Sequence, residues 1–238
     1  VLTATGSTFI GGLAGQGISG TKLTGIHNTA VGASAGLLLQ GTANNNTLIG
    51  VQAGDNITTG DSNIIIGSGI DPASATADSQ LNIGGWIVGS AGQITMPSQP
   101  AFNVNKGGTS QDNIPVGGDQ AVTWSTEVYD IGANFASNTF TAPVTGKYQM
   151  NLMLRLGNLD SAVSYYIVSI TTSNRSYRFL FDPDFGQDQV YWSITYSVLT
   201  DMDASDTAAV TIHQSDGTAQ TDISGDVIYT YWQGYLAC

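Results

Sequence analysis

The sequence predicts an all-β protein with two unlike parts: an N-terminal β-solenoid-like repeat shaft over residues 1–98 and a C-terminal jelly-roll sandwich over residues 99–238. Three observations predict it. A glycine-ended segment recurs at a nearly constant spacing in the first part, and strands with alternating apolar and polar residues fill the second. No stretch has the spacing of an amphipathic helix, and a single Glu with 6 Lys+Arg leaves little material for surface helices.

The boundary between the parts is marked by a change in composition. Residues 1–98 hold 19 of the 30 glycines but only two of the aromatic residues, Phe9 and Trp86. The segment at residues 96–100, Met-Pro-Ser-Gln-Pro, separates them from the aromatic-rich remainder. A compositional shift at prolines is typical of a domain boundary, so we place one after residue 98.

The shaft repeats a short segment in which a β-branched residue precedes a glycine. Four copies lie at residues 28–32, 46–50, 63–67 and 80–84, and a weaker copy lies at residues 7–11. The glycines of the four copies are 18, 17 and 17 residues apart. Such a period predicts a stack of coils, each with one short strand and one glycine-permitted corner.

Two sets of repeat positions are expected to form columns along the stack. The apolar column, expected to be internal, is Val31, Ile49, Ile66 and Ile83. The polar set is Asn28, Asn46 and Asn63, which we expect either to stack as a ladder or to take the positive-φ corner that Asn tolerates.

The thinness of the repeat predicts self-association. A 17-residue turn with one or two apolar side chains buries too little apolar surface to offset the conformational entropy lost when it is ordered. We therefore expect three chains to share the apolar column. A single-chain β-helix with hexapeptide turns competes with this arrangement because three hexapeptides also make 18 residues. The drift to 17 counts against it.

The head contains strands with one buried face. Alternating apolar residues predict two long strands, with buried faces at Tyr148, Met150, Leu152, Leu154 and Leu156, and at Val190, Trp192, Ile194, Tyr196 and Val198. Shorter strands are expected at residues 101–105, 121–124, 128–131, 162–171, 177–181 and 208–213. With a last strand at residues 227–232 this makes about nine, which implies two stacked antiparallel sheets.

The last predicted strand is apolar or aromatic on both faces. In an antiparallel sandwich this means that the outer face is covered too, by a buried edge or by another subunit. We expect a subunit contact, made by Val227, Tyr229 and Tyr231.

Four segments of the head resemble the C1q/TNF-like domain. Residues 100–102 (Pro-Ala-Phe), 138–148 (Asn-Thr-Phe-Thr-Ala-Pro-Val-Thr-Gly-Lys-Tyr), 206–210 and 232–236 are similar to the family's start, core motif, Gly-Asp strand and close, in the family's order. The pattern differs at Asn138, Ser205 and Trp232. The resemblance implies a jelly roll that forms a homotrimer and binds a partner through exposed loops, without catalysis. The shaft repeat is similar to Asn-Thr-Ala-Val-Gly repeats of phage tail fibres and, more loosely, to heads of trimeric autotransporter adhesins.

The charge of the chain limits its partners. With 6 Lys+Arg against 18 Asp+Glu the net charge is −12, so neither nucleic acid nor an anionic membrane surface is expected to bind. No apolar run is long enough to span a bilayer, so no membrane insertion is expected. One cysteine, Cys238, and two histidines, His27 and His213, leave little for Cys- or His-based sites, and we expect no cofactor.

Three motifs are similar to parts of known catalytic, nucleotide-binding or calcium-binding sites. Residues 32–36 match the Gly-x-Ser-x-Gly elbow around Ser34, but residues 50–54 carry Gln at the same phase, which indicates a repeat corner. Residues 15–20 match a dinucleotide fingerprint without the helix that it needs. The carboxylates of residues 182–188 and 201–206 lack the twelve-residue calcium-loop pattern, and a structural calcium ion stays open.

The receptor contacts are expected in the loops at residues 157–161, 182–189 and 215–226, with Phe185 as an exposed aromatic. The predicted contacts are Asp160, Arg175, Tyr177, Arg178, Asp184, Phe185, Gln187 and Asp216. For Arg175 and Arg178, contact with an anionic sugar and an ion pair with a nearby Asp both stay open.

These features favour a non-enzymatic receptor-binding protein: the distal part of a phage tail fibre or spike, in the virion, which attaches as a homotrimer to a bacterial surface glycan or protein. The first alternative is a cellular or exosporium-type adhesin with the same head, extracellular or at the cell surface. The second is a capsule-degrading enzyme, which would need two carboxylates across a cleft.

Overall fold

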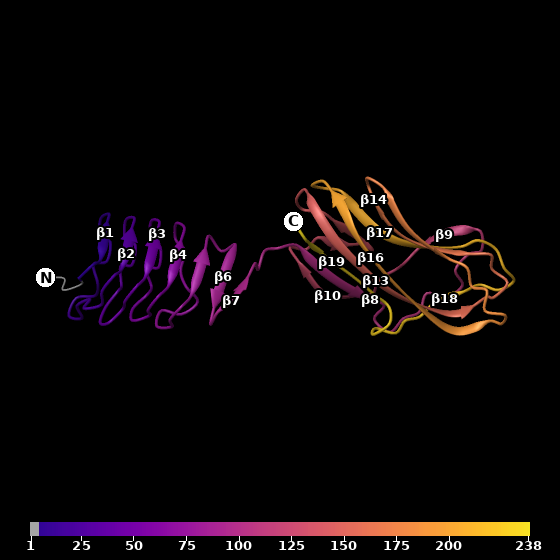
Figure 1. Ribbon diagram of the computed structural model, residues 1–238, viewed down its shortest axis with the longest axis horizontal. Coiled ribbons are helices and arrows are strands. Elements are labelled where there is room, and N and C mark those ends of the chain that lie inside the picture. Colours follow the sequence, from indigo (N-terminus) through magenta and orange to yellow (C-terminus); the bar gives the residue numbers. More distant parts are fainter. Residues whose placement is uncertain (1–4) are drawn as a thin grey trace. The chain divides into compact units, whose positions relative to one another are not determined.

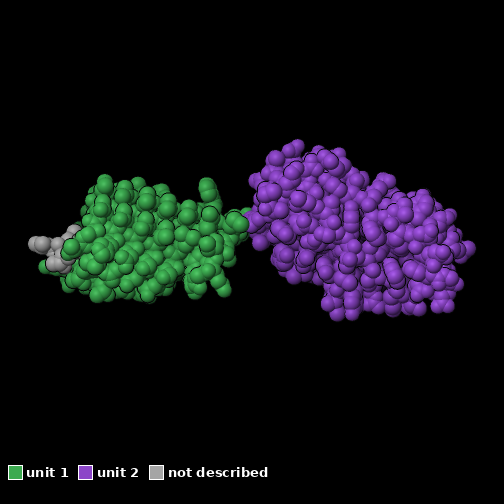
Figure 2. All heavy atoms as spheres, in the orientation of Figure 1, with its two compact units in different colours: residues 1–98 green, residues 99–238 purple. Residues whose placement is uncertain are grey.

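The computed structural model describes residues 5–238, and every regular element in that range is a strand (Figure 1). None of these residues belongs to a helix that could span a membrane. The chain divides into two compact units, residues 1–98 and 99–238 (Figure 2). The expected all-β class, with a solenoid-like stack followed by a sandwich, is confirmed.

The shaft is a stack of coils with one three-residue strand in each. The strands β1 (Thr8–Ile10), β2 (Thr29–Val31), β3 (Thr47–Ile49), β4 (Ile64–Ile66) and β5 (Leu81–Ile83) pair in parallel and in register. Two antiparallel strands, β6 (Ile87–Ser90) and β7 (Gln93–Thr95), continue the sheet beyond β5. The stack therefore changes from coils to hairpins at its C-terminal end.

The glycine that ends each strand is required by the close approach of successive coils. Gly32 and Gly50 have φ values of 136° and 134°. A Cβ on Gly32 would lie 2.2 Å from the carbonyl oxygen of Gly50, and one on Gly50 would lie 2.3 Å from that of Gly67. Any other residue would push the coils apart, which explains why the repeat keeps glycine at this phase.

Two residues further on, the chain turns the repeat corner. Ser34 and Gln52 both have positive φ there, 59° and 57°. Ser34 therefore occupies a repeat corner followed by no helix, unlike the nucleophile of an elbow motif.

Each coil closes around an apolar interior of its own. The central residues of three neighbouring strands, Ala30, Leu48 and Ile65, are completely buried. In the coil that starts at β2 they are joined by Ala35, Leu39 and Ala43. The expectation that a turn buries only one or two apolar side chains is therefore wrong. Each coil closes within one chain, but it has one three-residue strand and not the hexapeptide turns of the competing arrangement.

The expected inner column also needs correction. Val31, Ile66 and Ile83 are only partly buried and Ile49 is 41% exposed, because they sit one position after the buried strand centres. Side chains alternate between the two faces of a strand, so a shift of one residue moves the whole column from the inside to the outside.

A ladder of buried amides holds one corner of the stack. Asn28, Asn46 and Asn63 are completely buried, and the side-chain oxygen of each accepts the backbone N–H of the equivalent residue in the next coil at 2.9–3.0 Å. Their amide nitrogens donate to the carbonyls of Ala43, Gly60 and Ala77. The ladder is confirmed, whereas the positive φ belongs to the preceding residues, such as His27 and Asn45.

The head is a sandwich of two antiparallel sheets. The first has the order β10-β8-β19-β13-β16, with β18 also paired to β13, and the second has the order β11-β12-β17-β14-β15. The first comprises β8 (Ala101–Asn105), β10 (Thr126–Ile131), β13 (Gly146–Leu159), β16 (Gln189–Met202), β18 (Asp222–Ile223) and β19 (Tyr231–Leu236). The second comprises β11 (Phe135–Ala136), β12 (Thr139–Thr141), β14 (Tyr166–Thr172), β15 (Ser176–Phe181) and β17 (Thr207–Gln214). The strand β9 (Gly118–Ala121) lies beside β17.

The core of the head lies between these sheets. Alternate residues of β13, from Tyr148 to Leu156, are buried as predicted. They meet an aromatic cluster in which the Trp232 ring packs edge-on against Phe102 and Phe135. This core leaves the outer faces of both sheets free to carry other functions.

Several of the head's predicted strands differ from the structure. Residues 122–124 of the strand expected at 121–124 are not in a strand, and the one expected at 162–171 begins only at Tyr166. Residues 227–230 form a turn and the last strand begins at Tyr231, so Val227 and Tyr229 do not belong to a strand with two apolar faces. On β16, Val190 and Trp192 are 68% and 42% exposed despite their alternation. That strand is the edge of its sheet, so its first half has a neighbour on one side only.

Replacing Asn46 by alanine should destabilise the shaft. The change removes one of the ladder's buried side chains and leaves the Gly60 carbonyl without its amide donor. We expect the free energy of unfolding to fall by roughly 2–4 kcal/mol, because an unsatisfied buried group costs about 1–3 kcal/mol in addition to the lost bond. Denaturant unfolding followed by circular dichroism measures it.

The matched control is Gln93→Ala, an exposed position of the same unit. It should change the free energy of unfolding by less than about 0.5 kcal/mol. Equal effects of the two substitutions would contradict a stabilising role of the ladder.

Candidate receptor-binding site

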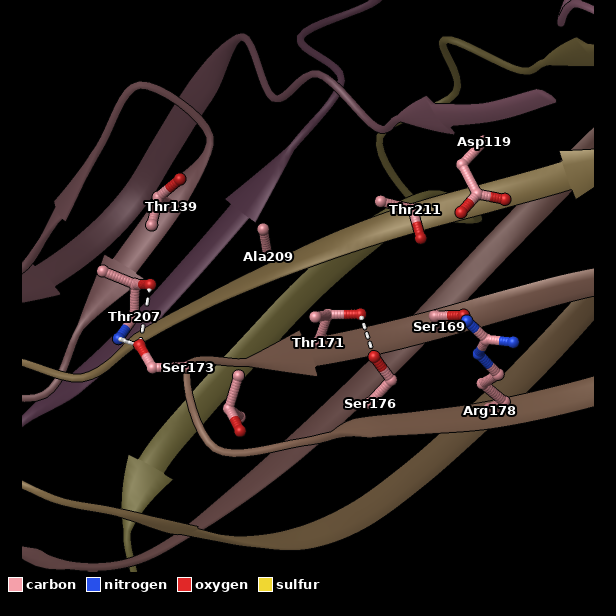
Figure 3. Close-up of a pocket in the computed structure, with 11 residues that line it drawn as sticks. Asp119, Thr139, Ser169, Thr171, Ser173, Ser176, Arg178, Thr207, Ala209 and Thr211 are labelled. Atoms are coloured by element: carbon pink, nitrogen blue, oxygen red, sulfur yellow. Dashed lines mark hydrogen bonds between the residues drawn. The ribbon is translucent and has the colours of Figure 1, made fainter.

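A polar groove of about 390 Å³ runs over the outer face of the five-stranded sheet (Figure 3). Its lining is dominated by side chains with hydroxyl groups, and Asp119 and Arg178 are the charged residues among them. The lining consists of Asp119, Thr139, Ser169, Thr171, Thr172, Ser173, Ser176, Arg178, Thr207, Ala209 and Thr211. The groove is thus a surface of hydrogen-bonding groups with one cation and one carboxylate.

The register of the sheet arranges this lining in rows across the strands. Thr211 of β17 faces Ser169 of β14, which faces Arg178 of β15. The neighbouring row contains Ala209 and Thr171. The side chains of Ser169, Thr211, Ala209 and Thr171 are short, whereas that of Arg178 is long. The outer face of the sheet is therefore hollowed along the row, and Arg178 bounds the hollow.

The Asp119 end of the groove is fixed by a histidine. The Asp119 carboxylate lies 2.8 Å from Nδ1 of His213, and the ring of Tyr165 stacks parallel to the His213 ring at 6.1 Å. Asp119 itself is largely exposed, so one side of its carboxylate faces solvent.

A second, aromatic hollow of about 310 Å³ lies between the edge strands β15 and β16. Phe179, Phe181, Phe185 and Trp192 line it, and the rings of Phe185 and Trp192 are 4.7 Å apart. Phe185 is therefore half-buried against Trp192, and Trp192 is the more exposed aromatic of the pair.

The two arginines of the predicted site are separated. Arg175 forms an ion pair with Asp201 at 3.0 Å, and the Tyr177 hydroxyl donates to the same carboxylate at 2.9 Å. The hydrogen bond from Tyr177 lowers the pKa of the Asp201 carboxyl below its usual value. Arg178 points to the other face of β15, into the groove, because residues alternate along a strand.

Asp160 is a buried structural residue, not a surface contact as expected. Its side chain is 2% exposed, and its oxygens accept the backbone N–H groups of Ala162, Thr218 and Ala219 at 2.6–2.8 Å. Burial raises the pKa of the Asp160 carboxyl, but the hydrogen bonds from these donors together hold it below its usual value. The carboxylate therefore ties the loop after β13 to the segment around residues 218–219.

Two further loop aspartates have a similar role at the surface. The Asp216 carboxylate accepts hydrogen bonds from the backbone and hydroxyl of Ser164, which lowers its pKa. Asp188 is bonded in the same way to Ser161, with the same effect on its pKa. The remaining predicted contacts, Asp184 and Gln187, are exposed. The predicted residues therefore do not form one cluster.

On the six-stranded sheet, Arg155 lies among two aromatic rings and a carboxylate. The guanidinium of Arg155 lies 3.9 Å from the centroid of the Tyr191 ring, 4.8 Å from that of Tyr229 and 3.3 Å from a carboxylate oxygen of Asp226. Val227 and Tyr229 are 47% and 41% exposed, and Tyr231 is partly buried. Whether these residues contact another subunit stays a prediction.

Within the part of the chain that the structure describes, no three His, Cys, Asp or Glu side chains are grouped so that they could hold a metal ion. The acidic segments at residues 182–188 and 201–206 thus do not form such a group.

Of the residues that line the groove, only Arg178 was among the predicted contacts. Ser169 and Thr211 are outward positions of alternating strands, which is a readable signal. Asp119, however, lies 50 residues before Ser169, and only the folding of the strands into one sheet brings the two residues into the same groove.

Comparisons with known proteins bear on the fold alone. No protein-family model matches the sequence, and no curated protein matches it. Among solved structures, the globular domain of zebrafish complement 1qA protein is similar at 16% identity, with 59% of this chain and 98% of that chain covered and a TM-score of 0.43. Two murine APRIL structures are similar at 13% and 14% identity, each with 58% of this chain and 98% of that chain covered and a TM-score of 0.41.

Replacing Asp160 by asparagine should destabilise the head at neutral pH. The amide nitrogen of Asn cannot accept the backbone donors, so we expect a loss of roughly 2–3 kcal/mol at pH 7. Because the pKa of Asp160 is lower in the folded state than in the unfolded chain, the stabilisation of the native protein disappears as the pH falls below about 4.

Unfolding free energies measured between pH 7 and pH 3 test this. The difference between the native protein and Asp160→Asn should shrink with acidification. The control Asp184→Asn, at an exposed position, should follow the native protein throughout. A difference that does not vary with pH would show that the Asp160 charge is not responsible.

Proposed function

We propose that the protein is a non-enzymatic attachment protein that works as a homotrimer, the distal part of a phage tail fibre or spike that holds the virion to a bacterial surface glycan or protein. The proposal rests on the outer face of the shaft strands. Apolar side chains on that face are open to solvent, although other apolar residues already fill the interior of each coil.

The outer face carries two columns of side chains. One consists of the residues just before the glycines, and Ile10 and Ile49 in it are 59% and 41% exposed. The other begins with threonines and ends with Ile64 and Leu81, of which Ile64 is 43% exposed. The column before the glycines is apolar in every coil, which is typical of a protein–protein interface, and its repetition along parallel strands fits identical partners.

The head supports association independently. Its six-stranded sheet exposes Tyr191 and Tyr235 by 56% and 46%, and the Arg155 guanidinium stacks on Tyr191. Aromatic residues and arginine are the types enriched in interfaces. The resemblance of the head's motifs to the trimeric C1q/TNF-like domain favours three copies over two.

The structural roles of the acidic residues in the head favour a binding function over catalysis. Asp160, Asp188 and Asp216 accept hydrogen bonds that hold loops together, so their carboxylates already have structural partners. Three identical sites on one trimer gain avidity by simultaneous attachment to a surface, so each site can be shallow, as the groove of the five-stranded sheet is. The similarity of the shaft repeat to tail-fibre repeats favours the virion as the location.

Aspartates on the outer face of the shaft should weaken the trimer without unfolding the coils. We propose the double substitution Ile49→Asp and Ile66→Asp, which puts charges where apolar side chains would meet and leaves the buried Leu48 and Ile65 in place. The concentration at which trimers dissociate should rise at least about a hundredfold, because uncompensated charges in an interface cost several kcal/mol. Sedimentation over a concentration series measures it.

The control is the double substitution Gln52→Asp and Ser34→Asp, which adds the same two charges at repeat corners, outside the strand face. It should sediment like the native protein. Equal sedimentation of the control and the Ile49→Asp and Ile66→Asp variant would contradict association through the strand face.

The attachment function is tested on cells. Fluorescently labelled native protein should bind to the surface of the bacteria that the proposed virion infects, found by screening a panel of strains, and unlabelled trimer should displace it. Absence of saturable attachment across the panel would overturn the proposed function.

A further inference from the structure

The groove over the five-stranded sheet contains a row of polar side chains without partners, and we infer that this row binds an acidic sugar residue of a surface glycan. The inference deepens the proposed function and rests on it, since it names the class of receptor that the head would hold. In this arrangement Arg178 pairs with the sugar carboxylate, Ser169 and Thr211 bond to sugar hydroxyls, and Asp119 accepts further hydroxyls.

The most telling residue is Ser169, on the floor of the groove. It is only 6% exposed, and its hydroxyl has no hydrogen-bond partner among residues 5–238. Its Oγ is not among the fully buried side-chain atoms that lack a partner, so the hydroxyl opens into the groove, where a ligand can bond to it. The next hydroxyls along the sheet, Thr171 and Ser176, instead bond to each other at 3.2 Å.

The residues on either side of Ser169 are also free. Neither the Thr211 hydroxyl nor the Arg178 guanidinium has a hydrogen bond or ion pair within the described range. By contrast, Arg155 and Arg175 are both paired with aspartates in this acidic head. Three unpartnered polar groups therefore stand side by side on three paired strands, over two strand spacings or about 10 Å.

The shape of the groove lets a ligand reach this row. On one side of the row the positions are filled by the short residues Ala209 and Thr171, which leaves the groove open there (Figure 3). On the other side stand the larger residues His213, Ile167 and Leu180. Asp119 stands at the opposite end from Arg178, and its carboxylate is oriented by Nδ1 of His213. A ligand lying along the row would meet a cation at one end and a hydrogen-bond acceptor at the other.

The chemistry of the lining selects an acidic sugar over other ligands. Hydroxyls and one carboxylate can bond the many hydroxyls of a saccharide, whereas a peptide anchored by apolar side chains would find no apolar pocket here. The planar guanidinium of arginine binds a carboxylate in a two-bond fork. The head carries fourteen acids against five bases, and its net charge of −9 disfavours ligands with several phosphates. A single carboxylate can still bind, because Arg178 supplies a local positive charge.

The test is a calorimetric titration of the 238-residue chain with trisaccharides that carry glucuronate, galacturonate, mannuronate or sialic acid, and with neutral trisaccharides of matched length. We expect at least one acidic trisaccharide to bind, and to bind more tightly than its neutral counterpart. Binding of none of them, or equal binding of the neutral ones, would overturn the inference.

Variants then locate the site. Arg178→Gln should weaken binding of that trisaccharide at least about tenfold, because a charge-assisted hydrogen bond is lost, and Ser169→Ala should weaken it several-fold. Arg175→Gln removes the same charge three residues away, outside the groove, and should change affinity less than about twofold. Unfolding midpoints of the three variants check that the fold is kept. Equal loss in Arg175→Gln and Arg178→Gln would contradict a site in the groove.

Attachment to cells separates this inference from the proposed function. If Arg178→Gln attaches to cells as the native protein does, the groove is not the receptor site while the attachment function stands. If the native protein itself does not attach, the function fails whatever the trisaccharides do.

Discussion

The structure of the shaft depends on the way successive coils are held at a fixed spacing. Glycines let the backbone of one coil approach the next, and buried amides of Asn28, Asn46 and Asn63 bond each coil to its successor. This spacing puts equivalent residues directly above one another in parallel strands. An apolar residue that recurs once per coil therefore forms a continuous stripe. The neighbouring positions already fill the interior, and side chains alternate along a strand, so the stripe faces outward. The proposed association of three chains rests on that geometry.

The head uses the outer faces of its sheets differently. The six-stranded sheet carries exposed aromatic residues and a stacked arginine, which fits contact with other copies. The five-stranded sheet carries short hydroxyl residues with one unpaired arginine, which fits a hydrated ligand. The loops between the strands are held by Asp160, Asp188 and Asp216, so they are braced rather than free to reach a receptor. The sheet face, not the loop tips, is then the better candidate for recognition.

Much of the fold was accessible from the sequence because it depends on local repetition. Spacing of glycines and asparagines predicted the coils and the amide ladder, and alternation predicted the long strand β13. The inner column was misplaced by one residue, since a three-residue strand shows too little alternation to decide which face is buried. The short strands β11, β12 and β18 were missed for the same reason. Of the predicted contacts, Arg178 lies in the groove, while the burial of Asp160 depends on donors 58 and 59 residues away that no local pattern reveals.

We propose that the apolar face of the shaft and the aromatic face of the head are covered by two further copies of the same chain. The most direct test is the mass of the native protein in solution, measured by light scattering at micromolar concentration. We expect a single species with the mass of three chains. A folded, monodisperse single chain at that concentration would contradict it.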